Sequence, residues 1–473
     1  MKKFLILATA LLVCFGANAQ TISKSDITKN TSGSLSKEDI SEIQKSFVLD
    51  GPTTALQNIL TNNKGITQFA YSRDAIGKLD DYFKYKTDVR GITNQLSSGR
   101  CWLFCSQNEI RTIAAKKFGV KEFYFSQNYN SFWDLFEKSN LFLENVISTA
   151  DKDMDDREVA FYFKSPVGDG GVWNLFINLA EKYGAVPADV MPETEQSNNT
   201  SQMRAILNEK LRTGGWELRE AAAAGAKLRD LRKQKIQIMK EVYRILALCL
   251  GNPPEEFTWR YKDTKGEVHT VTSTPLEFYH SIVPPSQYNS ADMVMVMNDP
   301  TRPYYQVYEI ASYRNTMEGV NWTYLNLPMD EIRDAALASI KDNNPVYTSS
   351  DVGKYSNRET GILDLDQYDY ESLFGITLNM DKKARILTRQ SGSSHAMLLV
   401  ACDTDENDKP VKWMFENSWG PKSCHNGYMI LTNEWFDAYL FRIVLHRQYI
   451  TSPQAIKALG TKPIQLPAWD YMN

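Results

Sequence analysis

The sequence has few of the residues on which several common architectures depend. Only 6 of its 473 residues are Cys, too few for a disulfide-stabilised scaffold. After an apolar run at residues 4–15, no segment approaches the length that crosses a bilayer, so we expect no membrane anchor. No charge of one sign dominates, because 53 Lys and Arg stand against 57 Asp and Glu, and nucleic acid is not the expected partner. Hydrophobic residues at 42% and charged residues at 23% instead indicate a globular protein.

The first residues have the pattern of a secretory signal peptide. Lys2 and Lys3 precede the apolar run, and the small residues 17–19 suit a signal peptidase. We expect cleavage after Ala19 and export to the periplasm or the medium. Because both lysines leave with the peptide, the net charge would change from −4 to −6.

Hydrophobic periodicity separates a helical part of the chain from a β-rich part. Apolar residues recur at helical spacing from Ser36 and again over 101–118. The segment 200–250, rich in Ala, Leu, Lys and Arg, predicts a helical insertion that is interrupted at Gly214-Gly215. Later segments alternate as strands do and include a hairpin at 256–273. We therefore predict an α+β fold. Its expected segments are a signal peptide (1–19), a loose leader (20–35), N-terminal helices with a helical half (36–199), a helical insertion (200–254) and a β-rich half (255–473).

One of the five histidines is placed as a catalytic base would be. His395 follows the small polar stretch 391–394 and opens the apolar segment AMLLVA. A strand would hold this residue firmly while presenting its ring to a cleft. The other four histidines are interpreted as structural or exposed; they are His269, His280, His425 and His446.

Cys101 is the candidate nucleophile. Gly99 and the periodicity that follows place Cys101 at a helix N-terminus, where the macrodipole favours a thiolate. A nearby His395 that takes the proton yields a thiolate–imidazolium pair. The Gln95 amide and the Cys101 N–H can donate to the oxyanion. Asn417 can fix the histidine ring, and Trp419 can shield that hydrogen bond from water.

The remaining cysteines carry no expected chemistry. Cys105 is interpreted as a buried helix residue, and the disulfide pairing of Cys105, Cys249, Cys402 and Cys424 is left open. A zinc site built from Cys101, Cys105, Cys424 and His425 matches no standard spacing. We expect no metal and no cofactor.

Four motifs in this order resemble the papain-type cysteine peptidases, and among them the bleomycin hydrolase / aminopeptidase C branch. The motifs are NQLSSGRCWLF, PVGDGGVWNLF, SSHAMLLVACD and ENSWG, and the resemblance covers about residues 36–473. It implies a papain-like fold of a helical half and a β-barrel-like half, peptide substrates, and a homohexamer. It also implies catalytic roles for Cys101, His395, Asn417 and Gln95. His395 follows Cys101 by 294 residues, against roughly 130–150 in simple papain-like enzymes, and the helical insertion lies within this longer interval.

The resemblance also implies how substrate is held. Gly170 and Gly171 would offer backbone to the peptide, with Trp419 beside them. The C-terminal arm, residues 467–473, would reach into the cleft, where the Asn473 carboxylate pairs with the substrate amino group. This predicts an aminopeptidase. The arm stops a few residues short of the usual ending, so cleavage as an oligopeptidase or endopeptidase is the alternative.

Two further functions compete with peptide hydrolysis. A Cys/His acyltransferase is disfavoured, because such enzymes usually pair the histidine with Asp rather than with Asn417. A nucleic-acid-binding hexamer using the basic helix at 210–244 is disfavoured by the acidic balance of the chain.

Overall fold

The computed structural model describes residues 33–75, 77, 79–284, 288–289 and 291–472. The predicted signal peptide and Asn473 lie outside these residues. The chain forms two compact units, which meet in sequence at Phe69 and Ala70.

The described part of the N-terminal unit, residues 33–69, contains short helices and no buried residue. Its helices are α2 (Lys37–Ser46), α3 (Gly51–Asn62) and α4 (Thr67–Ala70). Ser36 forms a capping box with Asp39 at the start of α2. Asp50 caps α3, so Gly51 and Pro52 form the first turn of that helix. Neither α2 nor α3 contains a buried residue.

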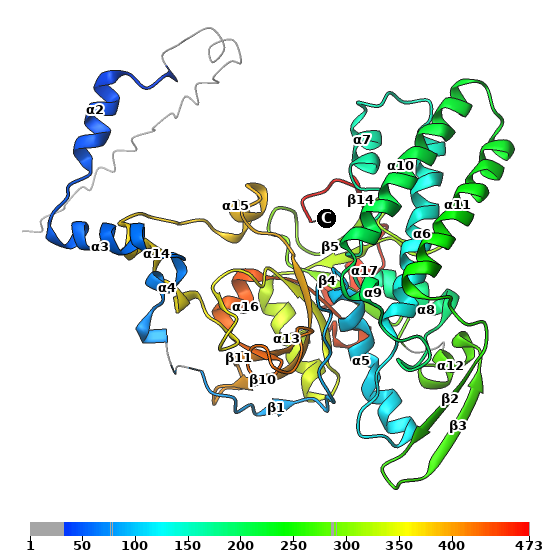
Figure 1. Cartoon of the computed structure of the whole chain (residues 1–473). Helices are drawn as coiled ribbons and strands as arrows, with labels where there is room; N and C mark the ends of the chain where they lie inside the picture. The colour runs from blue at the N-terminus through cyan, green and yellow to red at the C-terminus, as the bar shows by residue number, and fades with distance from the viewer. Residues whose placement is uncertain (1–32, 76, 78, 285–287, 290, 473) are drawn as a thin grey trace, which may run out of the picture. The chain divides into compact units, whose positions relative to one another are not determined.

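The second unit begins with a layer of helices. They are α5 (Cys101–Phe118), α6 (Gln127–Ser148), α7 (Arg157–Lys164), α8 (Trp173–Tyr183), α9 (Glu195–Asn198), α10 (Ser201–Ala223), α11 (Leu228–Leu250) and α12 (Pro275–Ile282). The long helices α6, α10 and α11 lie side by side (Figure 1). α5 ends at Gly119, whose φ of 64° is the left-handed conformation that glycine adopts without strain.

The expected interruption at Gly214-Gly215 is wrong. Both glycines lie inside α10, and the chain turns only between Ala223 and Leu228. A Cβ on Gly214 would stand 2.8 Å from the Ile238 side chain. The glycines therefore serve close helix packing, which overrides their weak helix propensity.

A large mixed sheet forms the second layer. Its strands are β1 (Tyr85–Lys86), β4 (Met293–Met297), β5 (Gln306–Ile310), β6 (Thr323–Asn326), β7 (Val346–Ser350), β8 (Ser356–Asn357), β9 (Ile362–Leu363), β10 (His395–Thr404), β11 (Pro410–Glu416), β12 (Tyr428–Thr432), β13 (Leu440–His446) and β14 (Ile464–Leu466). Their order is β14-β5-β6-β4-β13-β7-β10-β11-β12-β9-β8, and β1 also pairs with β10. The predicted hairpin is confirmed as β2 (Phe257–Lys262) and β3 (Val268–Ser273).

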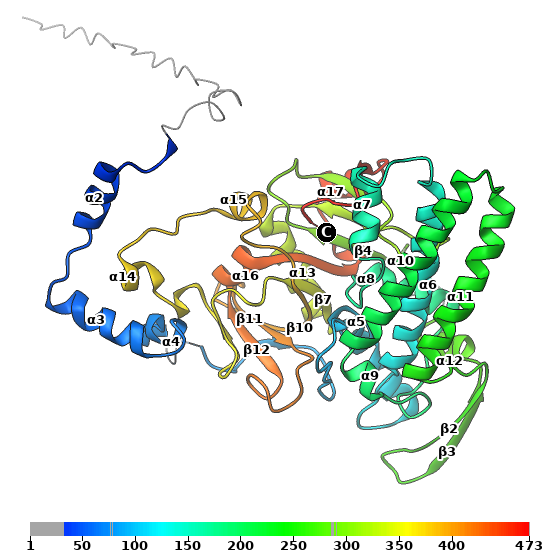
Figure 2. The ribbon, with the colours of Figure 1, turned by 45° about the horizontal axis from the view of Figure 1, so that its top comes forward.

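The sheet is buried on both faces. Along β10, Ala396 and Leu398 join the core shared with the helical layer, whereas Met397 and Leu399 join a second core. Helices α13 (Met329–Lys341), α16 (Asn433–Tyr439) and α17 (Pro453–Leu459) contribute residues to that second core. Sequence analysis did not predict α13 or α17. Figure 2 shows the helical layer on one side of the strands, and the α+β prediction is confirmed.

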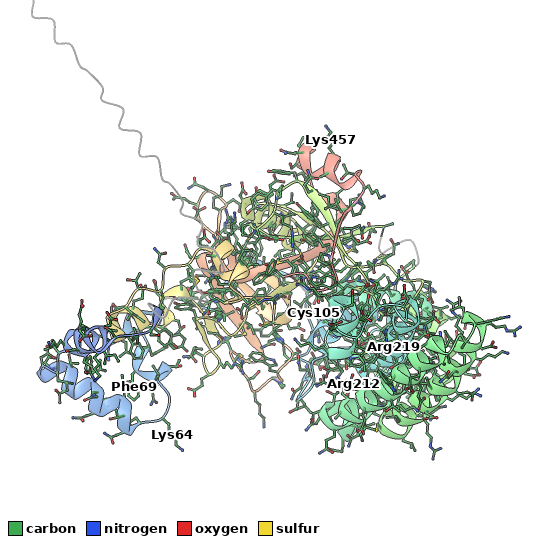
Figure 3. The ribbon with its side chains drawn as sticks, turned by 90° about the horizontal axis from the view of Figure 1, so that it is seen from above. Lys64, Phe69, Cys105, Arg212, Arg219 and Lys457 are labelled. Atoms are coloured by element: carbon green, nitrogen blue, oxygen red, sulfur yellow. The ribbon has the colours of Figure 1, made fainter. Side chains whose placement is uncertain are left out.

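The basic residues of the insertion hold helices together. Arg212 donates to the carbonyls of Phe163 and Lys164, and Arg219 donates to that of Thr149 at 2.8 Å. Figure 3 labels both arginines on α10. Two cations of the predicted basic stretch are thus committed to internal contacts. No helix among the described residues is long and apolar enough to span a membrane.

Candidate active site

The start of α5 meets the start of β10. Cys101 is the first residue of α5, as the sequence predicted, and His395 is the first residue of β10. The Ala396 N–H donates to Cys101 Sγ at 3.5 Å. Since N–H groups in the first turn of a helix have no intrahelical acceptor, the Cys101 N–H is available as a donor.

Asn417 holds the ring of His395. His395 Nε2 lies 2.8 Å from Asn417 Oδ1, which also accepts from the Ser418 N–H at 2.8 Å. Because a carbonyl oxygen only accepts, Nε2 carries the proton and Nδ1 is free to accept one. Asn417 is fully buried, and its amide nitrogen points at the sulfur of Met429, 3.5 Å away. The ring of Trp419 lies 4.9 Å from that of His395, as the predicted shield would.

Gln95 is hydrogen-bonded to Ser418, the residue that follows Asn417. Its backbone N–H donates to the Ser418 carbonyl, and its Oε1 accepts from the Ser418 hydroxyl at 2.7 Å. Its Nε2 donates one proton to the Ser98 carbonyl at 2.6 Å. An amide nitrogen has two N–H bonds, so the second remains for an oxyanion.

Burial disfavours each charge of the expected ion pair. Burial raises the pKa of Cys101 above its usual value and lowers that of His395 from 6.5 to about 4. Both shifts favour a neutral thiol beside a neutral imidazole. Moving the proton from sulfur to ring creates both charges together, and their attraction offsets part of the burial cost. The ion pair predicted from sequence therefore depends on this coupling.

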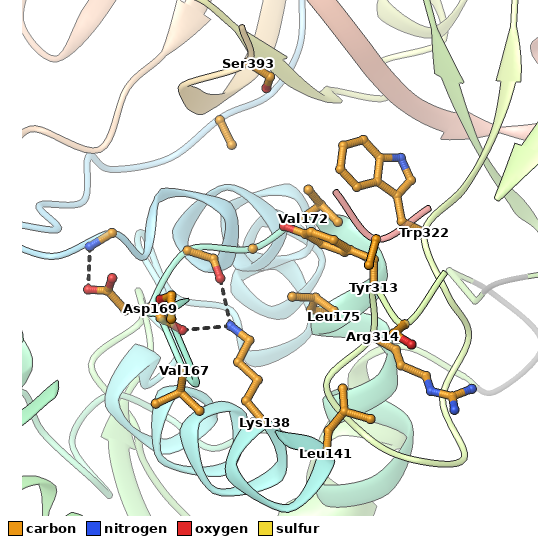
Figure 4. A pocket seen from close by; sticks show the side chains of 18 of the residues that line it. Lys138, Leu141, Val167, Asp169, Val172, Leu175, Tyr313, Arg314, Trp322 and Ser393 are labelled. Atoms are coloured by element: carbon orange, nitrogen blue, oxygen red, sulfur yellow. Dashed lines mark hydrogen bonds between the residues drawn. The ribbon is translucent and has the colours of Figure 1, made fainter. Parts of the chain in front are cut away.

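These groups open onto a cavity of about 850 Å³ between the helical layer and the sheet. Lys138 on α6 crosses its wall, where it donates to the carbonyls of Gly168 and Gly170 at 3.1 and 2.7 Å (Figure 4). It also pairs with Asp134 at 2.6 Å. Lys138 thus supports the segment 168–171, here called the glycine loop, and no sequence motif indicated this role.

Gly170 and Gly171, predicted to bind substrate, both line the cavity. A Cβ on Gly171 would stand 2.8 Å from Trp102, whereas Gly170 has open space there. Asp169 accepts from the Gly99 N–H at 2.7 Å and so ties this loop to the turn before Cys101. The loop is consequently fixed against the nucleophile.

The C-terminal arm reaches the same cavity. Ala468 and Met472 line its wall, and Met472 is buried. Asp470 pairs with Arg302, which also pairs with Asp299 at 2.7 Å. Asn473, the predicted anchor of the substrate amino group, lies outside the described residues.

The other candidate groups do not line the cavity. Cys105 is buried one turn after Cys101, and the five cysteines of the described residues are unpaired. A possible metal-ligating group stands on the β2–β3 hairpin, where ligand atoms of Asp263, Glu267 and His269 lie within 4.8 Å of one another. Asp263 Oδ1 already accepts from two backbone N–H groups, and nothing in the group faces the cavity.

A cysteine, a histidine and an asparagine at the junction of a helical layer and a sheet define the papain-like cysteine peptidases. The chain belongs to the peptidase C1-like family, whose model matches residues 34–473. It is 37% identical over 416 residues to aminopeptidase C of Lactobacillus delbrueckii subsp. lactis, covering 86% of this chain and 91% of that protein. It is 36% identical over 450 residues to bleomycin hydrolase of Mus musculus, covering 93% and 98%. The crystal structure of PepW from Lactobacillus rhamnosis HN001 superposes with a TM-score of 0.89 at 36% identity, covering 93% and 99%.

Proposed function

We propose that this protein is an aminopeptidase that removes N-terminal residues from peptides by a Cys-His-Asn thiol mechanism. The observation that carries the proposal is the convergence of Cys101, His395 and Asn417 at a cavity whose wall includes the C-terminal arm. The relatives named aminopeptidase C and bleomycin hydrolase support it.

Each residue has a defined part in the reaction. His395 takes the thiol proton through Nδ1, and Cys101 Sγ attacks the carbonyl of the first peptide bond. The Cys101 N–H and the second Gln95 N–H bind the oxyanion. His395 then gives the proton to the leaving amine. Water activated by the same ring releases the first residue from the thioester, and Asn417 keeps the ring oriented throughout.

The arm makes the cleft selective for chain ends. Met472 lines the same cavity as Gly170 and Gly171, so we expect a peptide that extends past its first residue toward the arm to collide with it. We propose that the arm combines this steric block with a charge clamp, in which a carboxylate of the arm pairs with the substrate ammonium. Cleavage inside a chain is the alternative outcome.

One peptide offered with a free and with an acetylated N-terminus separates these outcomes by mass spectrometry. We expect single residues to leave the free form only. Internal cleavage of both forms would show an endopeptidase. Cys101→Ala serves as the control, and full activity of that variant would refute the assigned nucleophile. Transfer of the acyl group to added amines in preference to water would favour an acyltransferase.

We also propose a homohexamer. α2 presents Ile40 and Ile43 on one face, and Phe47 follows as its C-cap. All three side chains are exposed, although their helical spacing is typical of a buried surface. A second copy of the chain is the occupant that a hexamer supplies. Light scattering should give six times the monomer mass, and Ile43→Asp should lower it; a monomeric wild type would contradict the proposal.

Export completes the proposal. The Lys2-Lys3, apolar and small-residue pattern of the first residues supports it. Mass spectrometry of the protein recovered outside the cytoplasm should find Gln20 as its first residue. An uncleaved chain confined to the cytoplasm would contradict export.

A further inference from the structure

An arginine without an acidic partner lies in the wall of the active-site cavity. Arg442 on β13 is 3% exposed and lines the cavity. Its guanidinium lies 4.0 Å from the centroid of the Trp322 ring, which lines the same wall. Among the described residues no carboxylate pairs with this guanidinium and none of its N–H groups finds an acceptor; Nε is fully enclosed and unpaired.

The other buried arginines show how this chain normally satisfies such a group. Arg111 pairs with Glu416 at 2.6 Å and also donates to Asn108. Arg100 pairs with Glu193 at 2.8 Å. A buried charge without a partner is costly, and burial lowers the pKa of Arg442. The unpaired state of Arg442 is therefore an exception within its own fold.

Among the described residues that line the cavity, no acid is free to pair with it. Asp169 is the only carboxylate among the described residues of the lining. It accepts from the Gly99 N–H and the Thr200 hydroxyl, and it pairs with Arg204 at 3.2 Å. Three further cations line the wall, namely Lys138, Lys164 and Arg314, and of these Lys138 is paired with Asp134. The lining thus carries positive charge that an anionic ligand would neutralise.

We propose that Arg442 is a specificity-determining residue whose guanidinium binds the side-chain carboxylate of an acidic residue in the peptide substrate. A guanidinium presents a planar pair of donors that matches a carboxylate in two parallel hydrogen bonds. Arg442 and Cys101 line the same cavity, so a peptide bound at the nucleophile can bring an acidic side chain to the guanidinium. This inference rests on the proposed peptidase function and names its substrate class.

The wild-type enzyme tests the inference without any substitution. Peptides of one sequence carry Glu or Gln at the first, second or third position, and kcat/KM is measured for each. Gln matches Glu in shape and lacks only the charge. We expect Glu to exceed Gln by about tenfold to a hundredfold at one position, the value of a charge-assisted hydrogen bond.

Two variants assign that preference to one side chain. Arg442→Gln should bring the Glu-to-Gln ratio close to one, and Arg442→Lys should retain part of it. The control Arg229→Gln removes an arginine from the surface of α11, where its side chain is 78% exposed, and should leave the ratio unchanged. Thermal melting verifies that each variant is folded.

The outcomes separate the two proposals. Hydrolysis of all peptides with no Glu preference at any position would overturn the role of Arg442 and leave the peptidase intact. An equal loss on Glu and Gln peptides in Arg442→Gln would mean that the guanidinium serves the thiolate alone, which also overturns it. If Arg442→Gln kept the Glu-to-Gln ratio and lost only the preference for free over acetylated N-termini, the guanidinium would act on the C-terminal arm. That result would also overturn the proposed role. No hydrolysis of any peptide by wild type would refute the proposed function itself.

Discussion

Neutralising Asp470 should loosen the C-terminal arm, so that the cleft accepts peptides with an acetylated N-terminus. Asp470 pairs with Arg302, and the two side chains are 5% and 15% exposed. Asp470 also accepts from the Met472 N–H at 3.1 Å, which turns the arm toward the cavity. Asp470→Asn keeps the shape and removes the charge, so the change isolates the ion pair.

The structure bounds the size of the effect. A hydrogen bond to a charged group is worth roughly 1.5–3 kcal/mol. Arg302 keeps Asp299 as a partner, which holds the loss near the lower value. Trp469 still lies 4.7 Å from the guanidinium of Arg157, and β14 still pairs with β5. We therefore expect release of the arm to become about tenfold more favourable, without loss of the fold.

The measurement is the ratio of kcat/KM for the acetylated peptide to that for the free peptide. It should rise about tenfold in Asp470→Asn, in proportion to the released arm. Asp151→Asn, on the exposed surface, makes the same charge change and should leave the ratio alone. An unchanged ratio in a folded Asp470→Asn would refute the argument that this ion pair fixes the arm.

Three further predictions concern acid stability, the buried ion pair and the glycine loop. Because the pKa of His395 is lowered from 6.5 to about 4, the unfolded chain binds a proton in this range that the folded chain does not. The free energy of unfolding should fall as pH falls from 6.5 towards 4, by about 1.4 kcal/mol per pH unit from this group. Urea unfolding at several pH values measures it, and an equal dependence of this free energy on pH in wild type and in His395→Gln would contradict the prediction. Glu416→Gln leaves Arg111 charged and buried, so it should cost about 3 kcal/mol in the same assay; a loss below 1 kcal/mol would contradict a buried ion pair. Lys138→Met removes the donor to Gly168 and Gly170 and should lower kcat/KM about tenfold, mainly through KM; a normal KM would show that the loop holds itself.

Much of the site was predictable because each motif is local. The helix from Cys101 follows from a glycine before an apolar periodicity, and the strand from His395 follows from an unbroken apolar run. The helix that begins after Ser36 and the hairpin at 256–273 follow from equally short patterns. In each case the residues that decide the structure are neighbours in the chain.

Long-range packing decided the features that were missed. The low helix propensity of Gly214 and Gly215 predicted a break in the helix, yet both residues stay helical because α10 packs closely on α11 there. Residues 329–341 form α13 because one of their faces packs on the sheet. Lys138 carries no motif, and its partners lie 30 and 32 residues away.

The sequence by itself determined the residue types of the reaction and their order, because nucleophile, base and orienting amide each stand in a short motif. Only the tertiary structure decided what surrounds them. It placed the Ala396 N–H against Cys101 Sγ across 295 residues and left Arg442 unpaired in the cavity wall. Arg442 was visible in the sequence as a charge within the apolar segment LFRIVL. Its meaning depends on which acids the fold brings near it, and a chain pattern does not contain that information.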